Sequence, residues 1–238
     1  MMTMAHDFKI RPAMGRQTGF TLLELLTVIS LIAVLAGVAL LSYDGVQDEG
    51  RDDVTRFEMV QIREALLQFR RDSGTNHFPG QGQYDCEELA DRAIANRPVN
   101  WPATIPAVST SNKAAWVSWC SHPANFWMLF VDPLGDGWSA DRKRGWHGPY
   151  LQRRDPSGDV DSGYTPDGAG RGNSGIPTSD LWQIKDAYDY AYLMFDLDDA
   201  NASHPARLVS VGDNSRYDGG NTADCTAASG DLMLCLTR

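Results

Sequence analysis

The stretch Thr18-Gly19-Phe20-Thr21-Leu22-Leu23-Glu24 decides how this chain is built, because it opens a long apolar run. From Phe20 to Leu41 nearly every residue is apolar, and a helix of roughly 20 such residues crosses a bilayer core. Glu24 is the ionisable residue within this run. A carboxylate at membrane depth is unfavourable by about 2.5–3.5 kcal/mol, so its presence indicates a function. A cut after Gly19 would give Phe20 a free amine, a cationic partner for Glu24.

Two ordinary targeting segments are the alternatives to such a processed helix. A secretory signal has an apolar core of about 7–15 residues followed by a small-residue cleavage site. The run from Phe20 to Leu41 is longer, and no Ala-x-Ala follows it. A plain signal anchor fits the length, but it gives no reason for Glu24 or for a glycine at the boundary. A processed N-terminal helix accounts for all three features.

The charges that flank the apolar run predict its orientation. Lys9, Arg11 and Arg16 precede it, and acidic residues at 44, 48 and 49 follow it closely. The positive-inside rule therefore leaves residues 1–19 in the cytoplasm and exports the remainder. The chain has a formal net charge of −10, which is a poor match for a phosphate backbone and argues against nucleic-acid binding. The basic runs at 142–144 and 153–154 are more typical of solvated loops.

Helical periodicity continues beyond the apolar run. Met59, Ile62, Leu66 and Phe69 recur at i, i+3, i+7 and i+10, with charged residues over much of the remaining surface. This pattern predicts an amphipathic helix with one face for a globular partner. Ser73-Gly74 is a typical helix end. We therefore expect a leader at 1–19, a membrane half of the helix at 20–41, an amphipathic half at 42–72 and an exported head at 73–238.

The head combines irregular segments with short strands. A short helix is expected at 86–95, whereas the apolar stretches 116–119 and 126–131 are too short to assign to helix or strand. Residues 155–178 are rich in Gly, Asp, Ser and Pro and predict a long surface loop. Strands are predicted at 188–197, 207–211 and 232–236. The expected fold class is α+β, a long N-terminal helix packed on a C-terminal antiparallel sheet with a loop-rich middle.

The segment Gly19-Phe20-Thr21-Leu22-Leu23-Glu24 resembles the processing site of the type IV pilin and pseudopilin superfamily. The head looks most like the major pseudopilin of type II secretion systems. That second resemblance is carried by Gly145-Trp146-His147-Gly148-Pro149-Tyr150-Leu151, by Asp180-Leu181-Trp182 and by the stretch from Ala206 to Asp213. The resemblance implies that a prepilin peptidase cuts after Gly19 and methylates Phe20. It also implies that Glu24 pairs with the amine of a neighbouring subunit during assembly.

Four cysteines, Cys86, Cys120, Cys225 and Cys235, lie in the exported part. An even number in an oxidising compartment predicts two disulfides, and four cysteines allow three pairings. We expect the pairs that are local in sequence, 86 with 120 and 225 with 235. Pilins often carry a loop-closing bridge at the place of the second pair.

Four aspartates near the end of the chain are candidate calcium ligands: Asp213, Asp218, Asp224 and Asp231. Calcium takes six to eight oxygens from flexible carboxylates and main-chain carbonyls. The resemblance implies a calcium loop here, although the usual Gly-Pro-Asp-Gly start and paired aspartates are missing. The alternative is ordinary turn chemistry, in which Asp and Asn side chains bond their own main chain.

Motifs for catalysis are missing from the sequence, which has no HExxH and no Gly-x-Ser-x-Gly. Seven tryptophans could form a sugar-stacking platform, but large aromatics usually supply buried core area. The expected function is structural: an inner-membrane subunit with a periplasmic head that assembles into a pilus-like filament, most simply a type II secretion pseudopilus. Its expected partners are further copies, other pseudopilins or minor pilins, the prepilin peptidase and an inner-membrane assembly platform. The alternative is a minor type IV pilin that acts as a binding module at a filament tip.

Overall fold

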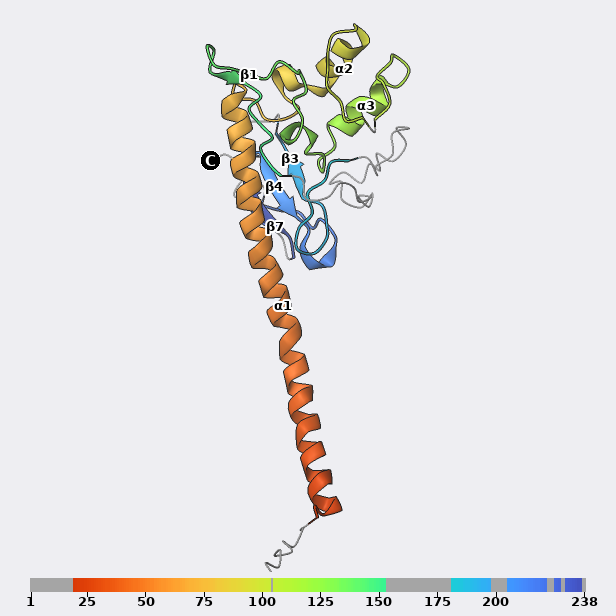
Figure 1. Cartoon of the computed structure of the whole chain (residues 1–238), viewed down its shortest axis with the longest axis vertical. Helices are drawn as coiled ribbons and strands as arrows, with labels where there is room; N and C mark the ends of the chain where they lie inside the picture. The colour runs from red at the N-terminus through yellow and green to blue at the C-terminus, as the bar shows by residue number, and fades with distance from the viewer. Residues whose placement is uncertain are drawn as a thin grey trace, which may run out of the picture. The chain divides into compact units, whose positions relative to one another are not determined.

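The computed structural model describes residues 19–103, 105–152, 181–197, 205–221, 225–227 and 230–236. Its first element is a single helix, α1, which runs from Leu22 to Asp72 (Figure 1). The chain divides into two compact units, Met1–Val46 and Gln47–Arg238, and each is described by itself.

The described part of the first unit is the apolar start of α1. One stretch of this helix, Leu22–Ala39, is long and apolar enough to cross a membrane, with a mean hydropathy of 2.5. None of that stretch is buried. An apolar helix without a protein partner needs either lipid or other copies to cover it, because water-exposed apolar patches of this size are unfavourable.

The core of the second unit is built on one face of α1. The four residues of the predicted stripe, Met59, Ile62, Leu66 and Phe69, are at most 2% exposed, whereas Val60, beside the stripe, is 49% exposed. The stripe belongs to one cluster that also contains the strand residues Leu208 and Val209. The expected amphipathic helix is therefore present, with its apolar face covered by the head.

A three-stranded antiparallel sheet with the order β3-β4-β7 packs against this face (Figure 1). The strands are β3 (Leu193–Phe195), β4 (Arg207–Ser210) and β7 (Leu232–Cys235). All four residues of the central strand β4 are buried. Arg63 on α1 donates a hydrogen bond from Nε to the carbonyl of Cys235, at 3.1 Å, which ties the helix to the last strand. The α+β, pilin-like architecture predicted from the sequence is thus observed.

The predicted strand at 188–197 is shorter than expected. Regular pairing begins only at Leu193, because the amides of Tyr188 and Tyr190 donate to the carboxylate of Asp186, each at 2.9 Å, rather than to a neighbouring strand. Asp189, between them, has a left-handed backbone with φ of 72°. A carboxylate-capped turn therefore replaces the first half of the predicted strand.

The middle of the chain is helical and aromatic. The helices are η1 (Gly82–Tyr84), α2 (Cys86–Ile94), α3 (Lys113–Cys120) and η2 (Trp127–Leu129). Helix α2 starts at an Asp85 side chain that accepts the amide of Glu88 at 3.0 Å, a typical N-cap. Trp116, Trp119 and Trp127 are buried and pack together with Trp101. These tryptophans form core and not an exposed stacking platform.

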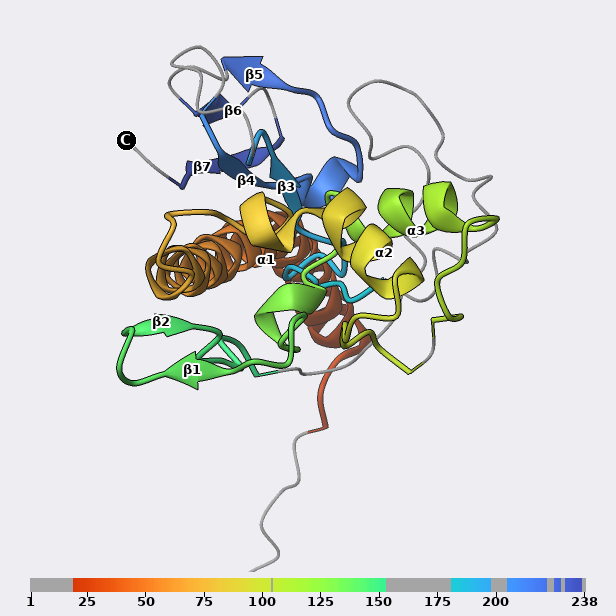
Figure 2. The ribbon, with the colours of Figure 1, turned by 90° about the horizontal axis from the view of Figure 1, so that it is seen from above.

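A small hairpin lies on a different side of α1 from the three-stranded sheet (Figure 2). Its strands are β1 (Trp138–Ser139) and β2 (Arg144–Gly145). Gly145 has a φ of 121°, and a Cβ there would lie 2.1 Å from the carbonyl oxygen of Gly137, so only glycine fits. Trp146 then donates its indole N–H to the carbonyl of Met128 at 2.8 Å. The Gly-Trp pair thus anchors the hairpin to the core.

Three further short elements lie in the C-terminal part of the described chain: η5 (Gly212–Asn214), β5 (Gly220–Asn221) and β6 (Thr226–Ala227). Strands β5 and β6 pair with each other in antiparallel fashion. The predicted surface loop at 155–178 lies outside the described residues, as do Asp180 and most of the leader.

Candidate processing and assembly site

Helix α1 begins with reciprocal hydrogen bonds between Thr21 and Glu24. The amide of Glu24 donates to the Thr21 hydroxyl oxygen at 3.2 Å. Glu24 Oε2 in turn accepts the Thr21 amide at 3.0 Å and the Thr21 hydroxyl at 3.1 Å. This arrangement is a capping box, which satisfies donors that a helix start otherwise leaves without partners. The order Thr-x-x-Glu is its sequence signal, so Glu24 has a role within the subunit besides the pairing between subunits expected from the sequence.

The capping box places the expected cleavage site outside the helix. Gly19 and Phe20 precede the first helical residue, Leu22, and both are exposed. No atom of the described residues lies within 4 Å of the position that a Cβ on Gly19 would occupy. The bond between Gly19 and Phe20 is therefore open to a peptidase without unwinding of the helix.

The carboxylate of Glu24 retains capacity for a partner from another chain. Both hydrogen bonds that it accepts use Oε2, and within the described residues Oε1 has no donor. The group lies in the first turn, where the positive end of the helix dipole favours an anion. A carboxylate in an apolar segment with one oxygen still able to accept hydrogen bonds can pair with a cation such as a free α-amine.

These features define a class of protein: a single exposed apolar helix that starts at a capped glycine boundary and belongs to a chain with an α+β head. The prokaryotic N-terminal methylation motif matches residues 14–40. A probable minor fimbrial protein of Dichelobacter nodosus is 38% identical over 99 residues. The matched region is 41% of this chain and 60% of that relative. No solved structure matches the chain.

The motif and the fimbrial relative agree with the observed architecture. The methylation motif and the similarity to a minor fimbrial protein support the type IV pilin and pseudopilin superfamily for this chain. Its apolar helix with the prepilin motif indicates anchoring in a membrane.

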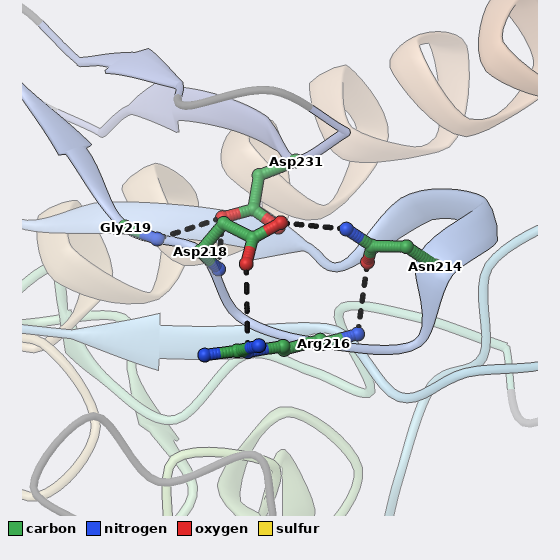
Figure 3. Close-up of polar contacts among 5 residues, drawn as sticks. All are labelled: Asn214, Arg216, Asp218, Gly219 and Asp231. Carbon is green, nitrogen blue, oxygen red and sulfur yellow. Dashed lines mark hydrogen bonds and ion pairs between the residues drawn. The ribbon is translucent and has the colours of Figure 1, made fainter.

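The C-terminal loop of the head brings together two of the four candidate calcium ligands (Figure 3). Asp231 accepts the amides of Asp218 and Gly219 through Oδ2, at 2.9 and 3.0 Å. Asp218 accepts the side-chain amide of Asn214 at 2.6 Å, and its other oxygen lies 3.5 Å from Nε of Arg216. Burial raises the pKa of Asp231 to about 6.

The donor set of this loop fits calcium poorly. Asp213 makes no hydrogen bond or ion pair with Asp218 or Asp231 among the described residues, and Asp224 lies outside them. Within the described part of the chain no group of three His, Cys, Asp or Glu side chains could hold a metal. The oxygens of Asp218 and one oxygen of Asp231 already face N–H donors. Oδ1 of Asp231 is buried without a partner, but a single oxygen falls far short of the six to eight that calcium takes.

Both disulfides join cysteines that are local in sequence. Cys86 is bonded to Cys120, which links the start of α2 to the end of α3. Cys225 is bonded to Cys235, which fixes the end of β7 to the residue before β6. This is the expected pairing. Both bridges restrain loops in the head, as is usual in exported proteins.

A buried polar network that no sequence pattern signals holds α1 against the head. The Tyr192 hydroxyl lies 3.1 Å from Oε2 of Glu58 and 3.3 Å from the carbonyl of Thr55. Asp186 accepts the Ser210 hydroxyl at 2.6 Å. Burial raises the pKa of Asp186 and of Tyr192. Sequence periodicity could not reveal these groups, because they come from three separate segments.

Proposed function

We propose that this chain is a minor structural subunit of a type IV pilus-like filament, which polymerises through the apolar part of α1. The observation that carries the proposal is the helix Leu22–Ala39, which is apolar, wholly exposed and preceded by a capped Gly19–Phe20 boundary. A plain anchor needs no such boundary. A subunit that leaves the lipid to enter a filament needs a removable leader and a group that sets its register.

The proposed sequence of events assigns one role to each site residue. A prepilin peptidase cuts after Gly19 and methylates the new amine of Phe20. An assembly platform in the inner membrane then extracts the subunit, whose head lies in the periplasm and whose leader faced the cytoplasm. Glu24 pairs with the Phe20 amine of a neighbouring subunit, and the apolar helices cover one another. The buried pair sets register, because an unpaired charge at that depth is strongly unfavourable.

The fimbrial relative supports a pilus over a secretion pseudopilus, since it carries the name of a minor fimbrial protein. A pseudopilin of a type II secretion system is the second candidate. The observation in its favour is the stretch 145–151, which resembles part of the major pseudopilin. In this stretch Trp146 and Tyr150 anchor the hairpin to η2 and α1. A tip subunit that binds sugar through its tryptophans has less support, because three of the seven lie in the core.

Neither catalysis nor calcium is part of the proposed function. The superfamily is structural. In the described part of the C-terminal loop, Asp218 and Asp231 supply two carboxylates whose oxygens, apart from one, already face N–H donors. The loop chemistry resembles the turn alternative more closely than a calcium cage.

The N-terminus of the mature protein tests this proposal. Mass spectrometry of the membrane-extracted chain should find a first residue Phe20 that carries one added methyl group. The variant Gly19→Val should retain the leader and fail to enter sheared filaments, although no described atom near Gly19 would clash with the new side chain. A mature chain that starts at Met1, or beyond Leu41, would sink the pilin assignment.

A further inference from the structure

The β1–β2 hairpin carries three consecutive cations that are not used within the subunit. Arg142, Lys143 and Arg144 are all exposed. In the described part of the chain their side chains make no ion pair and no hydrogen bond, although the main-chain amide of Arg142 donates to the Ser139 hydroxyl at 3.3 Å. Trp138 lies beside them, 37% exposed and stacked on His147 with ring centroids 4.7 Å apart. The hairpin thus offers a charged surface with an aromatic border.

The backbone of the hairpin holds one of these cations in an unusual position. Lys143 has a φ of 50°, in the left-handed region that glycine or asparagine usually occupies in a hairpin turn. A lysine here is less favourable to the fold than a glycine would be. Its presence is explained if the side chain serves a contact outside the subunit.

The same unit carries an acidic surface, in which Glu49 and Asp53 have no ion pair among the described residues. Asp48, Glu49 and Asp53 are exposed on α1, and the exposed cations next to them along the helix are Arg51 and Arg56. Arg51 lies 3.9 Å from Asp48 and over the ring of Tyr188. Glu49 and Asp53 stand at i and i+4, where like charges repel, and no described cation pairs with either.

The two surfaces lie at opposite ends of the helix within the head. The stem of Arg144 packs over Gly74, just after α1 ends, and Figure 1 shows β1 beside that end. Residues 49–53 precede Gly74 by about 32–38 Å of helix, at about 1.5 Å per residue. Tyr188 fixes the acidic end to the head by bonding the Asp48 carbonyl at 3.0 Å and Asp52 at 2.9 Å.

We infer that the Arg142-Lys143-Arg144 hairpin of one subunit binds the Glu49-Asp53 face of α1 in a second copy of this chain. Complementary charges at opposite ends of one body join copies head to tail, and a head-to-tail contact that does not close on itself generates a filament. The inference rests on the proposed filament function and names a contact between heads. It is separate from the pairing of Glu24 with Phe20.

Charge reversal and rescue test this contact in the full chain. We expect Arg142→Glu with Lys143→Glu to lower the yield of sheared filaments at least about tenfold, and Glu49→Lys with Asp53→Lys to do the same. The combination of all four changes should restore the yield to near wild type. Lys143→Gly is the sharper single change, because it relieves the backbone yet should still weaken assembly. Arg97→Glu, an exposed reversal outside both surfaces, is the matched control and should assemble normally.

Cross-linking locates the contact directly. Lys143→Cys paired with Asp53→Cys should give a ladder of disulfide-linked multimers, whereas Arg97→Cys with Asp53→Cys should not. Wild-type filament yield from the hairpin reversal, or a quadruple variant that is not rescued, would overturn the inference while leaving the proposed function standing. A hairpin reversal that abolishes binding to anionic vesicles and spares filaments would assign the hairpin to lipid instead, and would also overturn it. Failure of the wild-type chain to form filaments would defeat the proposed function itself.

Discussion

Replacement of Glu24 by Leu and by Gln separates two roles of this carboxylate. In the structure Glu24 closes a capping box with Thr21, and we propose that it also pairs with the Phe20 amine of the next subunit. Glutamine keeps the box, since Gln serves at this position as well as Glu, but it removes the charge. Leucine removes both. The two variants therefore differ in helix capping and agree in lacking the anion.

Glu24→Leu is expected to make membrane insertion more favourable and filament assembly less favourable. Leucine relieves a burial penalty of about 2.5–3.5 kcal/mol in lipid and loses about 1 kcal/mol of capping, so insertion becomes easier. In the filament, an ammonium without its counter-charge costs about 3–5 kcal/mol. That corresponds to about two to four orders of magnitude in the association constant between subunits. Both variants should be cleaved after Gly19 and then assemble poorly.

Assembly is measured by the yield of sheared filaments and by cross-linking between neighbouring helices. Cleavage is scored on the same samples, so that a processing defect is not mistaken for an assembly defect. If the Gln variant assembles like wild type and the Leu variant does not, the carboxylate acts only as a cap. Wild-type cross-linking in both would show that Glu24 sets no register at all.

Three further predictions concern the head. Replacement of both cysteines by alanine should destabilise the protein by about 3.8 kcal/mol for Cys86–Cys120 and by about 2.7 kcal/mol for Cys225–Cys235, because the bridges close loops with sequence separations of 34 and 10. Guanidinium unfolding in detergent measures both losses. A larger loss for the Cys225–Cys235 bridge would contradict the explanation by loop entropy. The pKa of Asp186 is raised on folding, so the folded state binds its proton more tightly, and stability should rise as pH falls through that raised pKa toward 3.8. Asp186→Asn should remove this component of the pH dependence. A variant whose stability depends on pH as in the wild type would refute the assignment to Asp186. Leu66→Ala should lower the free energy of unfolding by about 2–5 kcal/mol, because Leu66 is fully buried. Val60→Ala, on the exposed side of the same helix, should change it by no more than about 0.5 kcal/mol. Equal effects of the two changes in thermal unfolding would show that the stripe is not the core.

The features predicted well from the sequence are those set by local pattern. The stripe from Met59 to Phe69 repeats at helical spacing, so its burial follows from periodicity alone. The two disulfides join the cysteines that are local in sequence, which is the expected pairing among the three that four cysteines allow.

The features that could not be predicted depend on contacts between distant segments or on very short elements. Asp186 turns the start of the predicted strand at 188–197 into a capped turn, and the strand propensity of Tyr-rich residues gives no hint of that competition. The β1–β2 hairpin has two residues per strand, too few for any alternation to be visible. Proximity in sequence predicts that Asp213 lies with Asp218 and Asp231, yet only the latter two meet among the described residues.

The sheet order β3-β4-β7 bears on when the head can fold as the chain is exported. On the proposed topology the apolar stripe on α1 is exported early, but β7, which pairs with the central strand and receives the bond from Arg63, follows long afterwards. Contacts so distant in sequence form slowly, because a long loop must close before they contribute. During that interval Leu66 and Phe69 have no strand to cover them, and such exposed apolar surface aggregates readily. We therefore expect the exported head to need a chaperone on the periplasmic side, one that binds unfolded chains until Cys235 arrives to complete both the last strand and its disulfide.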